Sequence, residues 1–181
     1  MSYKCEKILD KDDINFLVSI SKECNWKNIY QLYNVFKCRI SYPQGKEHHI
    51  SEKMKTHLEI DFNCDVLTYF LDYVPGSFTR PHFDINTEYS VITVLEQNNL
   101  VGGYSIFYEN YLCPERGRDG SLVCERDDVE KQKPPYNKPI IPVVVSPEVG
   151  DSLVYNKKAR HGVSKVESGN RLVFVSWFRK K

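Results

Sequence analysis

The chain has 181 residues, which is the length of one globular domain and enough to bury a substantial core. Its apolar fraction of 41% and charged fraction of 27% are typical of a globular protein, and no apolar run approaches the roughly 20 residues needed to span a bilayer. The net charge of +1 gives no global reason to expect a nucleic-acid or membrane partner. We therefore expect a single domain over residues 1–181, and the composition carries no signal for an oligomeric state.

The first residues, MSYKCEKILDKDD, lack the apolar segment of a secretory signal, and we expect a cytoplasmic location. Six cysteines are scattered along the chain without the paired spacing of a zinc site. In a reducing compartment such cysteines are free thiols, and this is our expectation. A bridge between Cys113 and Cys124, which bracket a polar loop, is the less favoured alternative.

Residues 1–63 predict a mainly helical support region. Asp12 is a candidate N-cap for an amphipathic helix that ends near Asn25. The aromatic-rich stretch that follows predicts a short helix in IYQLY, residues 29–33, and then an edge strand in FKCRISY, residues 36–42.

A further helix is predicted over residues 48–60, where apolar side chains recur at helical spacing. This segment carries His48, His49 and His57. A histidine needs a positioned partner to serve as a ligand, so we interpret these three as surface or helix-packing residues.

From Val66 onward the chain changes to short apolar runs typical of β-strands: VLTYFLDYV, YSVITVL, GGYSIFY, IIPVVVS, DSLVYN and RLVFVSWF. The turn signals PG, NN, GG, SPEVG and ESGN separate them, a pattern typical of a sandwich or barrel. We predict a mainly β fold with N-terminal helices, in which residues 64–181 form a jelly-roll core. A polar stretch at about 109–139 interrupts it, and a loop of that length is usually a functional lid or a disordered excursion.

A candidate metal site lies in the segment YVPGSFTRPHFD, residues 73–84. His82 and Asp84 are two residues apart, and on an extended chain such neighbours point to the same face. His161, in the segment ARHG, follows a later strand and is a candidate third ligand. Two histidines and one carboxylate that leave coordination positions open form the facial triad of non-haem Fe(II) oxygenases.

Arg171 begins RLVFVSWF, a segment that is apolar on both faces and therefore predicts a central, buried strand. By alternation, Arg171 shares one face with Val173, Val175 and Trp177. A guanidinium among apolar side chains is costly unless an anion meets it, and its fork matches a carboxylate with two hydrogen bonds. The anion is either a bound dicarboxylate or, as the alternative, an internal Asp or Glu.

The successive motifs YxPGxxxxxHxD, GGYSIF, PxxGDSLVYN, H-x9-R and SWF together resemble those of the Fe(II)/2-oxoglutarate dioxygenases. Within that superfamily the chain is most similar to the prolyl-4-hydroxylase-like branch, and the resemblance covers about residues 67–178. It implies a double-stranded β-helix core. The motifs are short, and their specificity lies in their combination.

The resemblance also implies roles for particular residues. The iron ligands would be His82, Asp84 and His161, and Arg171 would bind the distal carboxylate of 2-oxoglutarate. Further candidates, matched less specifically, are the co-substrate contacts Tyr73 and Ser105 and the substrate-pocket residues Trp177 and Arg80.

The implied function is Fe(II)- and 2-oxoglutarate-dependent hydroxylation of a C–H bond with dioxygen, with decarboxylation of 2-oxoglutarate to succinate and ascorbate as the reductant. The favoured substrate is a protein or peptide residue, prolyl first, read by the loops 77–81, 85–89 and 109–139. The alternatives are an oxygenase of a small molecule or free amino acid, and a non-catalytic jelly-roll binding module. Repair of alkylated nucleic acid is disfavoured, because that group has a second arginine near the end of the final strand, where this chain has Ser176 and Trp177.

Overall fold

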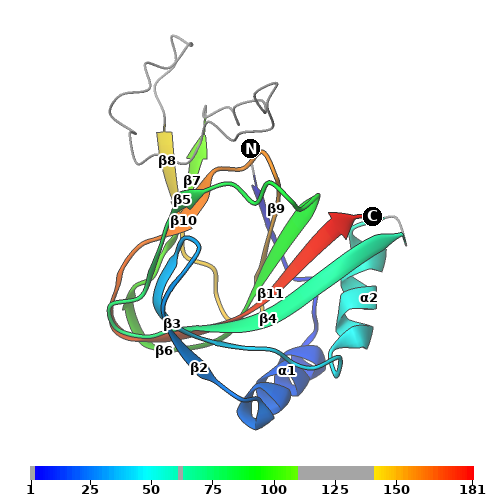
Figure 1. Cartoon of the computed structure of the whole chain (residues 1–181), viewed down its shortest axis with the longest axis horizontal. Helices are drawn as coiled ribbons and strands as arrows, with labels where there is room; N and C mark the ends of the chain where they lie inside the picture. Colours follow the sequence, from blue (N-terminus) through cyan, green and yellow to red (C-terminus); the bar gives the residue numbers. More distant parts are fainter. Residues whose placement is uncertain (1–2, 61–62, 110–140) are drawn as a thin grey trace.

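The computed structural model describes residues 3–60, 63–109 and 141–181. Figure 1 shows a β-barrel-like body with two helices outside it. The elements in chain order are β1 (Tyr3–Glu6), α1 (Lys11–Glu23), β2 (Lys27–Leu32), β3 (Val35–Ser41), α2 (His48–His57), β4 (Cys64–Tyr73), β5 (Phe78–His82), β6 (Tyr89–Gly102), β7 (Ser105–Glu109), β8 (Ile141–Val145), β9 (Ser152–Asn156), β10 (His161–Val163) and β11 (Val166–Lys180).

The strands form the two sheets of a double-stranded β-helix, which confirms the predicted fold class. In the described residues these two sheets are parts of one continuous 11-stranded sheet, with β9-β6-β11-β4 on one side and β5-β10-β7-β8 on the other. Strand β3 pairs with both β4 and β5, so it closes the barrel between the two sheets on that side (Figure 1). Strand β1 adds to the opposite edge of the first sheet by pairing with β9.

The N-terminal region is less helical than predicted. Residues 29–33 do not form a helix, because Lys27–Leu32 is a strand that pairs with β3, and this tertiary pairing outweighs local helix propensity. Strand β1 was not anticipated, whereas a strand at 35–41 and a helix at 48–57 are present as predicted. The predicted edge position of that strand is wrong, because β3 pairs with β2 and also with β4 and β5. Asp10 rather than Asp12 caps α1, since the Asp10 carboxylate accepts hydrogen bonds from the backbone N–H groups of Asp12 and Asp13.

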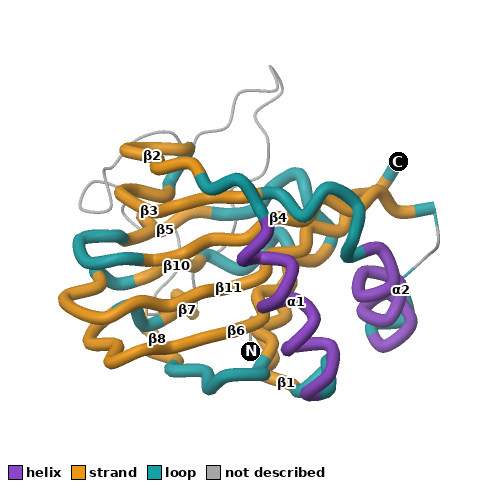
Figure 2. Tube along the Cα trace, turned by 90° about the horizontal axis from the view of Figure 1, so that it is seen from below, coloured by secondary structure: helices purple, strands orange, loops and turns teal. Residues whose placement is uncertain are grey.

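Strand β11 is the central strand that its apolar sequence predicts, because β6 and β4 flank it on either side. Its outward side chains Leu172, Phe174 and Phe178 pack in the core beneath the helices, together with Leu17 of α1 and Met54 of α2. Figure 2 shows α1 lying across the outer face of this sheet. The inward side chains of β11 face the barrel interior, and their alternation is as predicted.

The segments NN and ESGN do not end strands as expected. Both lie inside long strands, β6 and β11, which continue to pair beyond them with register irregularities between Val166 and Asn170. The ladder hydrogen bonds that each strand receives from its neighbour outweigh the local turn preference of these residues.

Gly169 shows how closely these two strands approach. Its φ of +73° is in the left-handed region, and a Cβ there would lie 2.2 Å from the carbonyl oxygen of Asn98 and 2.3 Å from that of Asn99. Gly45 has a φ of +85°, but a Cβ added to it would meet no atom within 4 Å. Gly169 therefore combines backbone strain with steric crowding, whereas Gly45 carries the backbone strain alone.

We expect Gly169→Ala to lower the free energy of unfolding much more than Gly45→Ala does. The left-handed conformation alone costs a non-glycine residue roughly 1–2 kcal/mol, and overpacking against backbone adds about 1–3 kcal/mol at Gly169. Urea unfolding of both variants measures the difference directly. Equal destabilisation of the two variants would show that β6 and β11 move apart at Gly169 without a measurable loss of stability.

Two of the expectations fall outside the described residues: the Cys113–Cys124 bridge and nearly all of the 109–139 loop. Among the cysteines that the structure describes, Cys5, Cys24 and Cys38 are free thiols. Among the residues that the structure describes, neither helix is long and apolar enough to cross a membrane.

Candidate metal centre and its cavity

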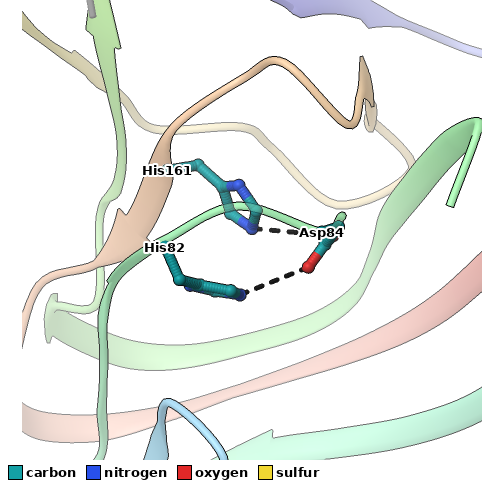
Figure 3. Close-up of side chains that lie close together, drawn as sticks. All are labelled: His82, Asp84 and His161. Carbon is teal, nitrogen blue, oxygen red and sulfur yellow. Dashed lines mark ion pairs between the residues drawn. The ribbon is translucent and has the colours of Figure 1, made fainter. Parts of the chain in front are cut away.

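The structure brings the three predicted ligands together (Figure 3). His82 ends β5, Asp84 follows it by two residues, and His161 begins β10 directly opposite His82 in the β5–β10 pairing. The His82 Nε2 lies 3.3 Å from Asp84 Oδ1, and the His161 Nε2 lies 3.8 Å from Asp84 Oδ2. The ligand atoms all lie within 4.8 Å of one another, which is close enough for one metal ion to contact all three.

Backbone carbonyls hold both histidines in the tautomer that a metal requires. The Nδ1 of His82 lies 2.8 Å from the Arg80 carbonyl oxygen, and the Nδ1 of His161 lies 3.1 Å from that of Ala159. A carbonyl oxygen only accepts, so each Nδ1 carries the proton and donates. Each Nε2 is then unprotonated, as a metal-binding nitrogen must be, and both face the carboxylate of Asp84.

Asp84 is the buried anion of the site. Burial by itself would raise the pKa of its carboxyl group, but His161, His82 and the hydroxyl of Ser90 together hold that pKa below its usual range. Ser90 Oγ donates to Asp84 Oδ2 at 2.6 Å, and Thr87 Oγ1 donates to the Asp84 backbone carbonyl at 2.8 Å. The carboxylate therefore stays ionised and oriented, as a metal ligand must be.

The donor set fits Fe(II). Burial lowers the pKa of His161 to about 4, with an opposing effect from Asp84 and a further lowering from His82. His161 is thus neutral near pH 7, the form that binds metal. Two imidazole nitrogens and one carboxylate, grouped on one side, match the facial ligand set of non-haem Fe(II) sites.

We expect Ser90→Ala to weaken binding of Mn(II), a redox-stable probe for the Fe(II) site. The lost hydrogen bond leaves Asp84 Oδ2 buried with one donor fewer, and loss of such an orienting partner typically costs roughly 10–100-fold in metal affinity. Calorimetric titration of the apoprotein measures this change.

Ser176→Ala is the matched control. Ser176 and Ser90 are both fully buried, but Ser176 Oγ has no hydrogen-bond partner among the described residues. Its removal should leave Mn(II) affinity within about twofold, since no contact to the site is lost. Equal losses in the two variants would contradict an orienting role for Ser90.

Tyr155 also belongs to the site, and the sequence reasoning missed it. Its hydroxyl lies 3.0 Å from His161 Nε2, and its ring centroid lies 4.3 Å from that of the imidazole. Because that nitrogen is unprotonated, the phenol is the donor. The alternation of DSLVYN on β9 was the only available signal, and it could not show that the phenol would reach a residue on another strand.

Arg171 lies in the same barrel interior and is 1% exposed. Its Nη1 donates to the Gly103 carbonyl oxygen at 2.8 Å, and both Nη atoms lie 3.2 Å from Ser105 Oγ. Within the described part of the chain its buried Nε has no hydrogen-bond partner, and no carboxylate forms an ion pair with it. Among the described residues, Arg171 therefore has no Asp or Glu with which to form the internal salt bridge that the sequence left as an alternative.

A cavity of about 630 Å³ connects these groups. Its lining includes the three candidate ligands, Arg171, Ser105, Tyr73, Tyr155 and Trp177. Tyr73 points its hydroxyl at Thr79 Oγ1, 2.9 Å away. Arg80 instead stacks over the Phe36 ring at 4.6 Å and lines a separate depression of about 450 Å³. The structure thus brings Trp177 into the main cavity and places Arg80 elsewhere.

Solved structures with the same fold span nearly the whole chain. A prolyl-4-hydroxylase from Pseudomonas putida aligns with a TM-score of 0.61 and 16% identity, covering 99% of this chain and 93% of its own. An oxidoreductase of the 2OG-Fe(II) oxygenase family from Burkholderia pseudomallei gives 0.68 and 11%, covering 99% and 86%. The α-ketoglutarate-dependent epimerase SnoN from nogalamycin biosynthesis gives 0.66 and 12%, covering 99% and 76%.

No protein-family model matches the sequence, and neither does any curated protein at a significant level. At identities of 11–16%, the structural likeness shows that the fold is shared. The chain therefore has the double-stranded β-helix fold of the solved 2-oxoglutarate/Fe(II) oxygenases, and inside it stand an intact His-Asp-His group and a buried arginine.

Proposed function

We propose that this protein is an Fe(II)- and 2-oxoglutarate-dependent oxygenase that hydroxylates a C–H bond. The observation that carries the proposal is the pairing, in one cavity, of a His-Asp-His group with a buried guanidinium that lacks a carboxylate partner among the described residues. A metal-chelating dicarboxylate meets both requirements at once, since one end binds at the metal and the other end neutralises Arg171.

His82, Asp84 and His161 would hold the iron, which when bound supplies the oxygen chemistry. Arg171 would bind the distal carboxylate of 2-oxoglutarate with its fork, while Ser105 and Gly103 fix the position of the guanidinium. Arg171 is 1% exposed, and a charge pair in such a buried position is stronger than one in water. Tyr73 would contribute its hydroxyl to the co-substrate, in exchange for its hydrogen bond to Thr79.

The proposed substrate is a protein or peptide residue, with proline preferred. Among the solved structures with this fold, one is a prolyl-4-hydroxylase and another is an epimerase from nogalamycin biosynthesis, so the fold accommodates more than one substrate class. The peptide preference is supported by the β2–β3 hairpin, where Tyr30 is 78% exposed and Tyr33 is 80% exposed. Tyr33 also lines the cavity, and an exposed tyrosine there suits stacking and hydrogen bonding to a peptide.

The purified protein, supplied with Fe(II), 2-oxoglutarate and ascorbate, should form succinate only when oxygen is present. Proline-containing peptides should raise that rate, because substrate binding couples decarboxylation to hydroxylation. Mass spectrometry then locates the added oxygen on the stimulating peptide. Stimulation by free amino acids alone would move the substrate to the small-molecule class, and absence of oxygen-dependent succinate with no retained iron would favour a non-catalytic jelly-roll binding module.

A further inference from the structure

The cavity contains a second arginine, which lies near the end of the final strand but two residues beyond Trp177. Arg179 lies on β11 eight residues beyond Arg171, on the same inward-facing side of the strand, and it lines the cavity. Arg171 and Arg179 are the only lysine or arginine residues among the described residues that line it. The cavity therefore has two guanidinium groups that lie eight residues apart on one strand.

Strand register places the candidate metal centre between these two cations. At one end, Arg171 contacts Ser105, which pairs with Val163 on β10 two residues beyond His161. At the other end, Trp177 pairs with Ser90, whose hydroxyl is bonded to the Asp84 carboxylate. Arg179 lies two residues past Trp177, which is about 7 Å farther along the strand. An anion at Arg179 would thus lie on the opposite side of the metal centre from the co-substrate.

Arg179 has no anionic partner within the described part of the chain. Its buried Nε has no hydrogen-bond partner there, as is also true of Arg171. Asp65 is its cross-strand neighbour, but the Asp65 carboxylate lies 3.5 Å from Lys181 Nζ and forms its ion pair with that lysine. The Arg179 side chain as a whole is half-buried, but a buried donor atom without a partner costs free energy, and a bound anion would offset that cost.

Aromatic side chains surround this end of the cavity. Tyr69 and Trp177 meet edge to face with their ring centroids 5.4 Å apart, and the Tyr42 centroid lies 6.3 Å from that of Tyr69. All three line the cavity. Such a wall packs against an apolar or ring-shaped group, while the adjacent guanidinium favours a carboxylate.

We propose that this end of the cavity, formed by Arg179, Trp177 and Tyr69, is a substrate subsite for a carboxylate attached to an apolar group. This subsite rests on the proposed function, and it implies that the substrate of the proposed oxygenase is an anion. The carboxylate belongs to a free or acylated amino acid, to a peptide C-terminus, or to an acidic side chain, and these three sources share the same recognition chemistry.

The test compares carboxylates with their neutral amides on the protein loaded with Mn(II) and saturating 2-oxoglutarate, so that Arg171 is occupied. The probes are N-acetyl-L-proline and N-acetyl-L-leucine, a proline-ending peptide as acid and as amide, and an amidated peptide with an internal Glu or Gln. Calorimetry should give at least about a tenfold preference for one class of carboxylate over its neutral partner. The probe class that shows this preference identifies whether the carboxylate belongs to an amino acid, a peptide C-terminus or an acidic side chain.

Arg179→Gln should reduce that preference to about onefold, and Arg179→Lys should retain part of it, because the charge remains without the fork. Lys180→Gln is the matched control, since Lys180 is the next cation along the strand, is exposed, and does not line the cavity. It should keep the full preference. The subsite is overturned if no carboxylate probe binds more tightly than its neutral partner, or if the preference persists in Arg179→Gln.

Failure of the proposed function gives a different result. In that case Mn(II) would not promote binding of 2-oxoglutarate to the wild-type protein. The same comparison of acids with amides, made on the apoprotein, then decides the subsite independently, because neither Arg179 nor its aromatic neighbours belong to the candidate ligand set.

Discussion

Replacing His82 with alanine should abolish Fe(II) binding and oxygen-dependent succinate formation while leaving the protein folded. The substitution removes one of three ligands, so we expect metal affinity to fall by more than the roughly 10–100-fold that loss of a partner orienting a ligand costs. Folding should survive, because the His82 side chain is 18% exposed and its hydrogen bond to the Arg80 carbonyl is local. Turnover should fall to background, because the proposed reaction requires the metal.

Metal content after anaerobic loading, succinate formation and thermal unfolding together measure this variant. The matched control is His48→Ala, which removes an exposed histidine at the start of α2, outside the cavity lining. It should retain metal binding and turnover. Turnover in His82→Ala at a rate near that of wild type would show that His82 is not a ligand.

Arg171→Gln should weaken 2-oxoglutarate binding by about ten- to a hundredfold while metal binding changes little. A hydrogen bond to a charged group is worth roughly 1.5–3 kcal/mol, and the variant loses the charge and the fork that would bind a carboxylate. Glutamine keeps a donor for the Gly103 carbonyl oxygen, so the barrel interior should stay intact. Burial lowers the pKa of Arg171, and an anion beside it would offset that effect.

Titration of 2-oxoglutarate into the Mn(II)-loaded protein measures the loss. Arg39→Gln serves as the control, because Arg39 is an arginine of β3 whose Nη1 already pairs with the Asp72 carboxylate at 3.1 Å. Removing this satisfied arginine should leave co-substrate affinity unchanged. Unaltered 2-oxoglutarate affinity in Arg171→Gln would assign Arg171 a structural role and remove the main support for the co-substrate.

Several features were readable from local sequence because each depends on a short, regular pattern. The i, i+2 spacing of His82 and Asp84 brings their side chains together without reference to the rest of the chain. The alternation of β11 likewise determined that Arg171 and Trp177 share a face, and its unbroken apolar character showed that the strand is central.

Other features were missed or wrongly predicted because they arise from pairing between distant segments. Residues 29–33 have the local character of a helix, yet Lys27–Leu32 is a strand because β3 pairs with it. Strand β1 is likewise defined by its ladder to β9. No property of either segment alone predicts these contacts, since their stabilisation comes from the partner strand.

The sequence by itself thus predicted the candidate ligands, the jelly-roll class and the inward face of the last strand, from residue spacing, strand periodicity and the resemblance of its motifs to those of the oxygenases. Only the tertiary structure decided which side chains from different strands meet: Ser90 with Asp84, Tyr155 with His161, and Arg179 with the aromatic end of the cavity. The physical reason is that strand register and barrel closure set these contacts. Both depend on packing and hydrogen bonding over the whole chain rather than on any local pattern.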